Sequence, residues 1–193
     1  MNITPDEIYK WSDENKETPK TSAAGIEQTT EMMRPYVEAA IMAQEGKNAQ
    51  EIADSIEHLK PLVRSSFVVD TLTYLHRGGR CTGLAAMAGG VLKLHPKIVV
   101  EDGKMRPDKK YRGKMERVVM DYAKDIEEDL KTAKKDRVFI THSGCSEDII
   151  DEVKNYLQTL NIFDEILVTR AGGVISSHCG PGTLGVLYIK RYE

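Results

Sequence analysis

Helical and strand-like segments alternate through the second half of this chain, and the alternation limits its fold more than any other feature. Residues 113–134 carry apolar side chains at helical spacing, and 146–160 form the next expected helix. Short apolar runs at 138–141 and 165–169 predict strands before and after that helix. Strands joined by helices pack in layers around one sheet, so the pattern predicts an α/β domain.

Other segments complete the predicted domain. Residues 96–100 and 105–111 are expected to form a β-hairpin, because Asp102-Gly103 between them is a favoured hairpin turn. The remaining expected elements are a strand from Phe67 that becomes helical by Leu72, a packed helix at 82–94, a short strand at 173–176 and a last strand at 183–192. We therefore expect residues 63–193 to form a two-layer α/β domain.

Residues 1–62 differ in character and are expected to be a reduced, mainly helical region. Helices are predicted at 4–16, at 26–45 with Pro35 inside it, and from Asn48 to about Leu59. Asn48 and Glu51 have the spacing of a capping box, in which each side chain bonds to the other residue's backbone N–H.

Composition excludes several classes of protein. The 193 residues are 40% hydrophobic and 30% charged, with a formal net charge of −3, which gives no global support to nucleic-acid binding. No apolar run approaches the roughly 20 residues that span a bilayer, and the polar N-terminus is unlike a secretory signal. Three scattered cysteines favour reduced thiols and a cytoplasmic setting.

The segment His178-Cys-Gly-Pro-Gly182 is the sharpest candidate for a functional site. Glycines around a proline force a rigid turn that can present backbone N–H groups and the His178 ring to an anion. A turn between strands beside a packed histidine is the alternative. Arg77-Gly-Gly-Arg80 can bind a carboxylate or phosphate, or can be a solvated loop. Thr21-Ser22 can donate hydrogen bonds to a carboxylate, or can cap a helix.

Two further patterns carry weaker hypotheses. The pairs His142/Cys145 and His178/Cys179 combine residue types of zinc sites and of nucleophilic catalysis. Their spacing does not match a four-ligand structural site, and no oxyanion-hole motif accompanies them. The run from Arg106 to Arg117 is dense in cations and can dock an acidic partner, or can be a solvated hairpin and helix start.

Several segments, in order, resemble the DegV family. They are Pro19-Lys-Thr-Ser22, Ala40-Ile-Met-Ala-Gln-Glu-Gly-Lys-Asn-Ala-Gln-Glu-Ile52, Val69-Asp-Thr-Leu-Thr-Tyr-Leu-His-Arg-Gly-Gly-Arg80, Leu94-His-Pro-Lys-Ile98, Asp102-Gly-Lys104, Arg112-Gly113 and His178-Cys-Gly-Pro-Gly182. Leu-x-x-Gly-Gly-Arg followed far downstream by His-x-Gly-Pro-Gly is a specific combination. The resemblance is continuous from about Ala40 to Tyr192 and looser before.

This resemblance implies a bacterial protein of two α/β domains that holds a long-chain fatty acid, such as palmitate, between them. It implies a carrier without catalysis or a cofactor of its own, which presents the acid to a fatty-acid kinase. Matched by motif, Thr21 and perhaps Ser22 hydrogen-bond the carboxylate, while Arg80 and His178 lie near it. The apolar residues from Leu84 to Leu94 are expected to help line the tail pocket.

The N-terminal region departs from the family pattern. Family members begin with a strand carrying an Asp-Ser-type motif and have a Ser-Gly-Thr segment after the Thr-Ser pair. Here Thr21 and Ala40 are only about twenty residues apart, so most of the first domain's sheet is expected to be missing. The alternative function is therefore a truncated interaction module that binds a protein partner and no lipid. A third is an enzyme that uses His178 and a cysteine.

Overall fold

The computed structural model describes residues 35–78, 94–101 and 104–192. Within them a six-stranded sheet has the order β3-β2-β1-β6-β4-β5. The strands are β1 (Val63–Val68), β2 (Leu94–Glu101), β3 (Lys104–Arg112), β4 (Arg137–Ser143), β5 (Glu165–Arg170) and β6 (Thr183–Ile189). In this sheet only β4 and β5 pair in parallel, and a helix connects them, as a parallel pair requires. Every other neighbouring pair is antiparallel.

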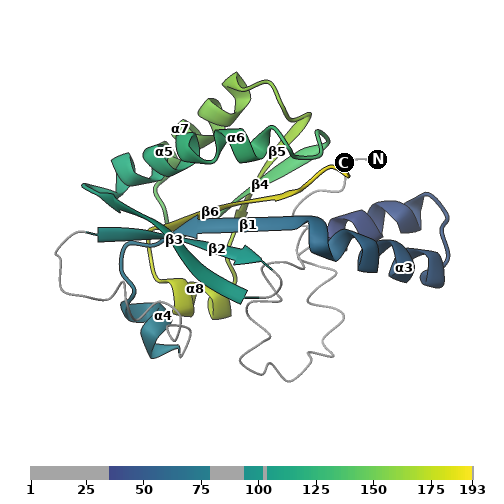
Figure 1. Cartoon of the computed structure of the whole chain (residues 1–193), viewed down its shortest axis with the longest axis horizontal. Coiled ribbons are helices and arrows are strands. Elements are labelled where there is room, and N and C mark those ends of the chain that lie inside the picture. Colours follow the sequence, from purple (N-terminus) through teal and green to yellow (C-terminus); the bar gives the residue numbers. More distant parts are fainter. Residues whose placement is uncertain (1–34, 79–93, 102–103, 193) are drawn as a thin grey trace.

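Helices lie on both faces of this sheet (Figure 1). On one face are α5 (Met115–Asp125), α6 (Glu127–Leu130) and α7 (Glu147–Thr159); on the other are the short helices α4 (Thr73–Arg77) and α8 (Gly173–Cys179). The α/β class predicted from the sequence is confirmed.

Each face has its own apolar core. Tyr122, Leu157 and Val186 belong to the larger core, under α5–α7. Phe67, Leu75 and Cys179 belong to the smaller one, which joins α4 and α8 to the sheet. Side chains alternate between the two faces of a strand, so β1 contributes Val68 to the first core and Phe67 to the second.

The described part of the N-terminal region is helical, as expected. Residues 35–44 form a helix, and α3 (Ala49–Leu59) follows with the predicted capping box between Asn48 and Glu51. A short 3₁₀ turn, η1 (Lys60–Leu62), leads into β1. The earlier helix contacts the sheet domain through buried Glu38, whose carboxylate lies 3.1 Å from the Lys134 ammonium. The division at residue 62 stays a prediction.

Four element predictions need correction. Residues 173–176, expected as a strand, belong to helix α8, because Ile175 and Cys179 lie four apart and both pack on the sheet. The helix at 113–134 is divided at Ile126, whose backbone leaves the helical region with φ −90° and ψ 2°. The last strand ends at Ile189, and β1 begins at Val63, before Phe67. The predicted helices at 4–16 and 82–94 lie outside the described residues, except for Leu94, which begins β2.

Candidate functional site

Helices α4 and α8 bring two of the sequence motifs into direct contact. Gly78 follows α4, and a Cβ added there would lie 2.1 Å from Cδ2 of His178. Gly180 follows α8, and a Cβ added there would lie 2.3 Å from the ring of Tyr74. Neither glycine can be replaced without moving an aromatic ring. The Arg-Gly-Gly-Arg and His-Cys-Gly-Pro-Gly segments thus meet on one face of the sheet.

The turn after α8 has a backbone that requires glycine. Gly180 has φ 82° and ψ 169°, a region that is essentially closed to residues with a Cβ. Gly182, at φ 77°, donates its N–H to the carbonyl of Ser143 at 2.7 Å, which fixes the turn to the end of β4. The rigid turn predicted from the sequence is confirmed, although it follows a helix and not a strand.

His178 is held with one ring nitrogen engaged and the other open. Nδ1 lies 2.9 Å from the carbonyl oxygen of Val174 and 3.2 Å from Oγ of Ser177. A carbonyl can only accept, so Nδ1 carries a hydrogen and Nε2 of the neutral ring is an acceptor. Within the described residues Nε2 makes no hydrogen bond. When the ring is protonated, Nε2 becomes a donor that suits a carboxylate.

An apolar cavity of about 40 Å³ lies beside α8, between that helix and the sheet. Its apolar wall is formed by Phe67 of β1, Met105 of β3, Leu187 of β6 and, from α8, Ile175 and Cys179. It admits a small apolar group and not a whole acyl chain.

Of the predicted carboxylate-binding residues, only His178 falls within the described structure. Thr21, Ser22 and Arg80 lie outside it, as do all but Leu94 of the expected tail-lining residues 84–94. Arg77 ends α4 and directly precedes Gly78, so the Arg-Gly-Gly-Arg segment begins beside His178. The clustering of Thr21, Ser22, Arg80 and His178 stays a prediction.

The metal and nucleophile hypotheses gain no support from the described residues. No group of three or more His, Cys, Asp and Glu side chains there could hold a metal ion. Burial raises the pKa of the Cys145 thiol to about 11 and that of Cys179 to about 12. A thiol with such a pKa is protonated near pH 7 and is a poor nucleophile.

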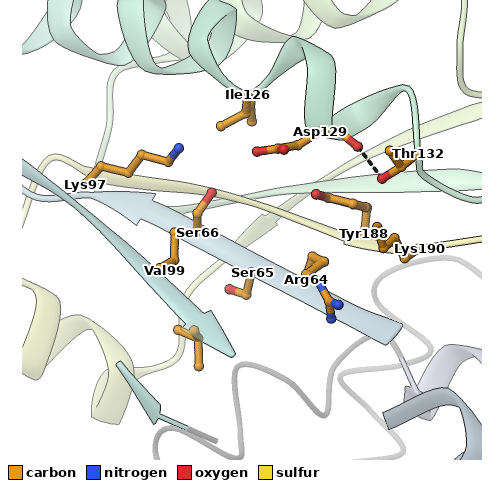
Figure 2. Close-up of a pocket in the computed structure, with 11 residues that line it drawn as sticks. Arg64, Ser65, Ser66, Lys97, Val99, Ile126, Asp129, Thr132, Tyr188 and Lys190 are labelled. Carbon is orange, nitrogen blue, oxygen red and sulfur yellow. Dashed lines mark hydrogen bonds between the residues drawn. The ribbon is translucent and has the colours of Figure 1, made fainter. Parts of the chain in front are cut away.

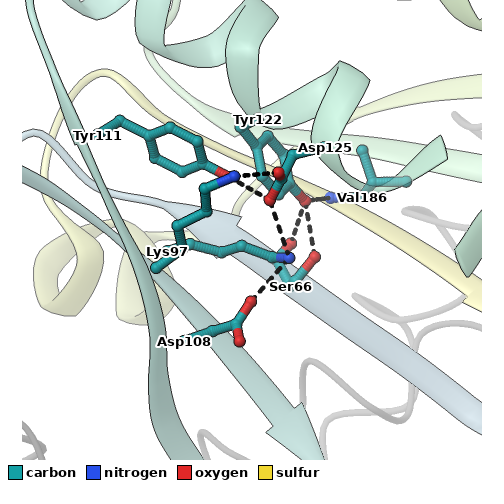
Figure 3. A network of polar contacts seen from close by, with 8 residues as sticks. Ser66, Lys97, Asp108, Tyr111, Tyr122, Asp125 and Val186 are labelled. Carbon is teal, nitrogen blue, oxygen red and sulfur yellow. Dashed lines mark hydrogen bonds and ion pairs between the residues drawn. The ribbon is translucent and has the colours of Figure 1, made fainter. Parts of the chain in front are cut away.

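Lys109 of the basic run takes part in an ion network between the hairpin β2–β3 and α5 (Figure 3). Buried Lys97 lies 2.8 Å from a carboxylate oxygen of Asp108 and 3.7 Å from one of Asp125. Asp125 also pairs with Lys109 and accepts a hydrogen bond from Tyr111 at 2.9 Å. The network fixes β3 to α5. Because β3 is at the edge of the described sheet, its exposed cations also discourage pairing with another strand.

A second, larger cavity of about 270 Å³ lies on the helix face, under α6 (Figure 2). Polar and apolar residues both line it, among them Ser66, Asp129, Val99 and Ile126. His178 and Gly78 do not line it, and Lys97, which does, is already compensated by the network above.

The sequence reasoning missed the contribution of Tyr74 and Gly78 to this site. Both lie in the Val69–Arg80 segment, whose glycines suggested only a flexible cationic turn. The glycine beside Arg77 serves instead to admit the His178 ring. Each of the two segments contains a glycine and an aromatic residue, but the sequence alone does not show which ring contacts which glycine.

Comparison with known proteins gives a family match. The family model described as "Uncharacterised protein, DegV family" matches residues 35–191. A DegV domain-containing protein of Caldanaerobacter subterraneus is 30% identical over 157 residues, which are 80% of this chain and 55% of that protein.

Solved structures share the fold. The crystal structure of DegV, a fatty acid binding protein from Bacillus subtilis, matches with a TM-score of 0.66 at 25% identity, covering 83% of this chain and 57% of that one. The Streptococcus pneumoniae Fatty Acid Kinase (Fak) B3 protein, loaded with linoleic acid, matches with a TM-score of 0.71 at 16% identity, covering 83% and 56%.

Coverage is unequal in all three comparisons: the chain spans only about half the length of the relatives that it matches. The family model nevertheless covers most of the chain, including α4, α8 and the glycine turn. By this match, the chain belongs to the DegV family.

Proposed function

We propose that this chain is a fatty-acid-binding protein that holds the carboxylate of a long-chain acid, such as palmitate, beside His178. The contact of His178 with Gly78 carries the proposal, because it brings both family motifs together next to an apolar cavity. The similar protein from Bacillus subtilis is itself described as a fatty acid binding protein.

The chemistry of the site fits a carboxylate. A carboxylate that leaves water needs donors or cations around it, and His178, when its ring is protonated, can supply one through the open Nε2. In this proposal Thr21, Ser22 and Arg80 complete the set of donors. The cavity along α8 contacts the acyl chain, and the rest of the tail site comes from residues beyond those described.

We further propose that the protein acts as a carrier without catalysis and presents the acid to a fatty-acid kinase. The similarity to a Fatty Acid Kinase (Fak) B3 protein supports this role. The high pKa values of Cys145 and Cys179 weigh against a thiol enzyme. No described helix is long and apolar enough to span a membrane. We propose a cytoplasmic location in a bacterium, which fractionation of the source cells would test.

Lipid binding is tested on the purified chain. Native mass spectrometry should show a co-purified long-chain acid, and added palmitate should raise the melting temperature. His178→Ala should weaken palmitate binding about tenfold or more, because a hydrogen bond to a charged group contributes about 1.5–3 kcal/mol. His58→Ala, on α3, is the matched control and should bind normally. An empty protein that palmitate does not stabilise would contradict the proposal.

That negative result would favour the second candidate, a truncated module that binds a protein partner. The observation behind it is the coverage of only about half of the relatives' length, which leaves part of a two-domain ligand site unaccounted for. The exposed cations of β3, among them Lys110 and Arg112, would then be the docking surface. Substituting both by Glu should abolish capture of an acidic partner and leave the melting temperature of the protein unchanged.

A further inference from the structure

Ser65 of β1 has a buried hydroxyl group that the proposed function does not use. The residue is only 4% exposed, and its Oγ has no hydrogen-bond partner among the described residues. A buried hydroxyl without a partner costs free energy, so most such groups in folded proteins are paired. The hydroxyl of Ser65 therefore indicates a partner that the described part of the chain does not supply.

The side chain of Ser65 lies on the α8 face of the sheet. It shares this face with Phe67, two residues further along β1. Figure 2 shows that Ser66, between them, points the opposite way, towards the helices of the other face. Ser65 pairs in register with Leu187 of β6 and Val100 of β2, which are both buried. The hydroxyl is thus surrounded by apolar side chains.

The apolar cavity beside α8 is lined by Ser65 and by other hydroxyl-bearing residues. Both cavities reach β1 at Ser65, but its side chain points to the α8 side. Two other hydroxyls at the apolar cavity are already paired. Oγ1 of Thr141 lies 2.8 Å from Oγ1 of Thr169, and Thr183 donates to the carbonyl of Cys179 at 3.0 Å. Ser65 can therefore offer a ligand a donor and an acceptor that these two threonines cannot.

The sheet also determines how far Ser65 lies from His178. Thr183 begins β6 and bonds to Cys179, the neighbour of His178 at the end of α8. Leu187, the register partner of Ser65, lies further along β6, about 13 Å from Thr183 at about 3.4 Å per residue. An acid whose carboxylate is held at His178 would therefore reach Ser65 well along its chain.

We propose that Ser65 forms a polar subsite that recognises an oxygen function near the middle of the acyl chain. The inference rests on the proposed function, which places the carboxylate beside His178. A hydroxyl group fits best, because it can both donate to Oγ of Ser65 and accept from it, whereas a plain hydrocarbon chain leaves Oγ unpaired. The ligand class is then a long-chain hydroxy acid, and Ser65 is a specificity-determining residue.

The test compares two acids of equal length on the intact protein. Octadecanoic acid and a hydroxyoctadecanoic acid with its hydroxyl near mid-chain are titrated by calorimetry. The wild-type protein should bind the hydroxy acid about fivefold more tightly, the effect of one net hydrogen bond. Ser65→Ala should remove this preference, and Ser65→Thr, which keeps a hydroxyl, should retain part of it. Ser66→Ala is the matched control and should keep the preference, since its hydroxyl bonds to Tyr122 on the other face.

A second measurement needs no added acid. Ser65→Ala removes an unpaired hydroxyl, whereas Ser66→Ala removes a bonded one from the same strand. Ser65→Ala should therefore lower the melting temperature of the lipid-free protein less than Ser66→Ala does. An equal or larger loss would show that Oγ of Ser65 has a partner within the protein, and would overturn the subsite.

The binding outcomes separate the two proposals. Equal binding of both acids by the wild-type protein overturns the Ser65 subsite and leaves the proposed function intact. A preference for the hydroxy acid that persists in Ser65→Ala also overturns the subsite. If neither acid binds, the proposed function fails, and the subsite fails with it.

Discussion

The imidazole of His178 packs against the α-carbon of Gly78. A methyl group added at residue 78 would stand 2.1 Å from ring atom Cδ2 of His178. The backbone of Gly78 has φ −77° and ψ −1°, which any residue can adopt. The reason for glycine here is therefore space for the ring and not backbone freedom. The contact brings together two segments that lie far apart in the sequence.

Replacing Gly78 by alanine should displace His178 and weaken fatty-acid binding about tenfold, which corresponds to about 1.4 kcal/mol. The fold should survive, because the backbone accepts alanine and only the ring must move. Calorimetric titration with palmitate measures the effect. Gly173→Ala is the matched control, since a Cβ there meets nothing within 4 Å. Equal affinities for the two variants would show that the position of His178 does not matter for binding.

The hydroxyl of Tyr122 joins α5 to two strands at once. It donates to the carbonyl of Ser66 at 2.8 Å and accepts the N–H of Val186 at 3.0 Å, at the point where these residues pair across β1 and β6 (Figure 3). Tyr122→Phe should lower the free energy of unfolding by about 1–3 kcal/mol, because buried backbone groups lose partners. Urea denaturation measures this. Tyr156→Phe, whose hydroxyl meets only the surface carboxylate of Glu127, should cost less.

Acid should weaken the network around Asp125. Partial burial alone would raise the pKa of Asp125, but hydrogen bonds from Lys109 and Tyr111, and the charges of Lys109 and Lys97, lower it overall. A lowered folded-state pKa stabilises the protein above the unfolded value of about 3.9, and this stabilisation is lost as the pH falls through the folded value.

Asp125→Asn should therefore reduce stability at pH 7 and flatten its decline below about pH 4. Urea midpoints at several pH values between neutrality and pH 2 would show this. Asp121→Asn on the same helix is the control, since its partner Arg117 is largely exposed. An unchanged acid decline in the Asp125→Asn protein would show that other carboxylates dominate it.

The thiols of Cys145 and Cys179 should resist alkylation in the folded protein. With pKa values of about 11 and 12, each is thiolate far less often at pH 7 than an ordinary cysteine. Iodoacetamide should react more slowly than with the unfolded chain, on the order of a hundredfold at Cys145 and a thousandfold at Cys179. Peptide mapping by mass spectrometry follows each cysteine separately. Fast labelling of Cys179 without unfolding would reopen the thiol-enzyme hypothesis.

Much of the fold was predictable because its signals are local. The apolar spacing of α5 and α7, the capping box at Asn48 and Glu51, and the hairpin β2–β3 each depend on residues close in sequence. Helix α8 was not predicted, because Val174 and Ile175 are β-branched and favour strands. Its helical form follows from packing of Ile175 and Cys179 on a sheet that the local sequence does not show.

The candidate site was predictable only in part. His178 was identified from its own turn, but its contact with Gly78 joins separate segments and depends on the sheet between them. His142 was noted only for a metal or nucleophile role. The pairing of β4 with β6 places its side chain on the α5–α7 face, on the same side of the sheet as its register partner Leu184. Such relations across elements have no signature in spacing along the chain.

The last strand of the described sheet, β6, lies at its centre, between β1 and β4. Before β6 is made, no hydrogen bonds join strands β1 to β3 to the parallel pair of β4 and β5. On the ribosome the sheet therefore cannot close until residue 189 has left the exit tunnel, so both halves wait with open edges during synthesis. Chaperone demand should accordingly be greatest late in translation, and a nascent chain stalled before residue 183 should remain sensitive to protease.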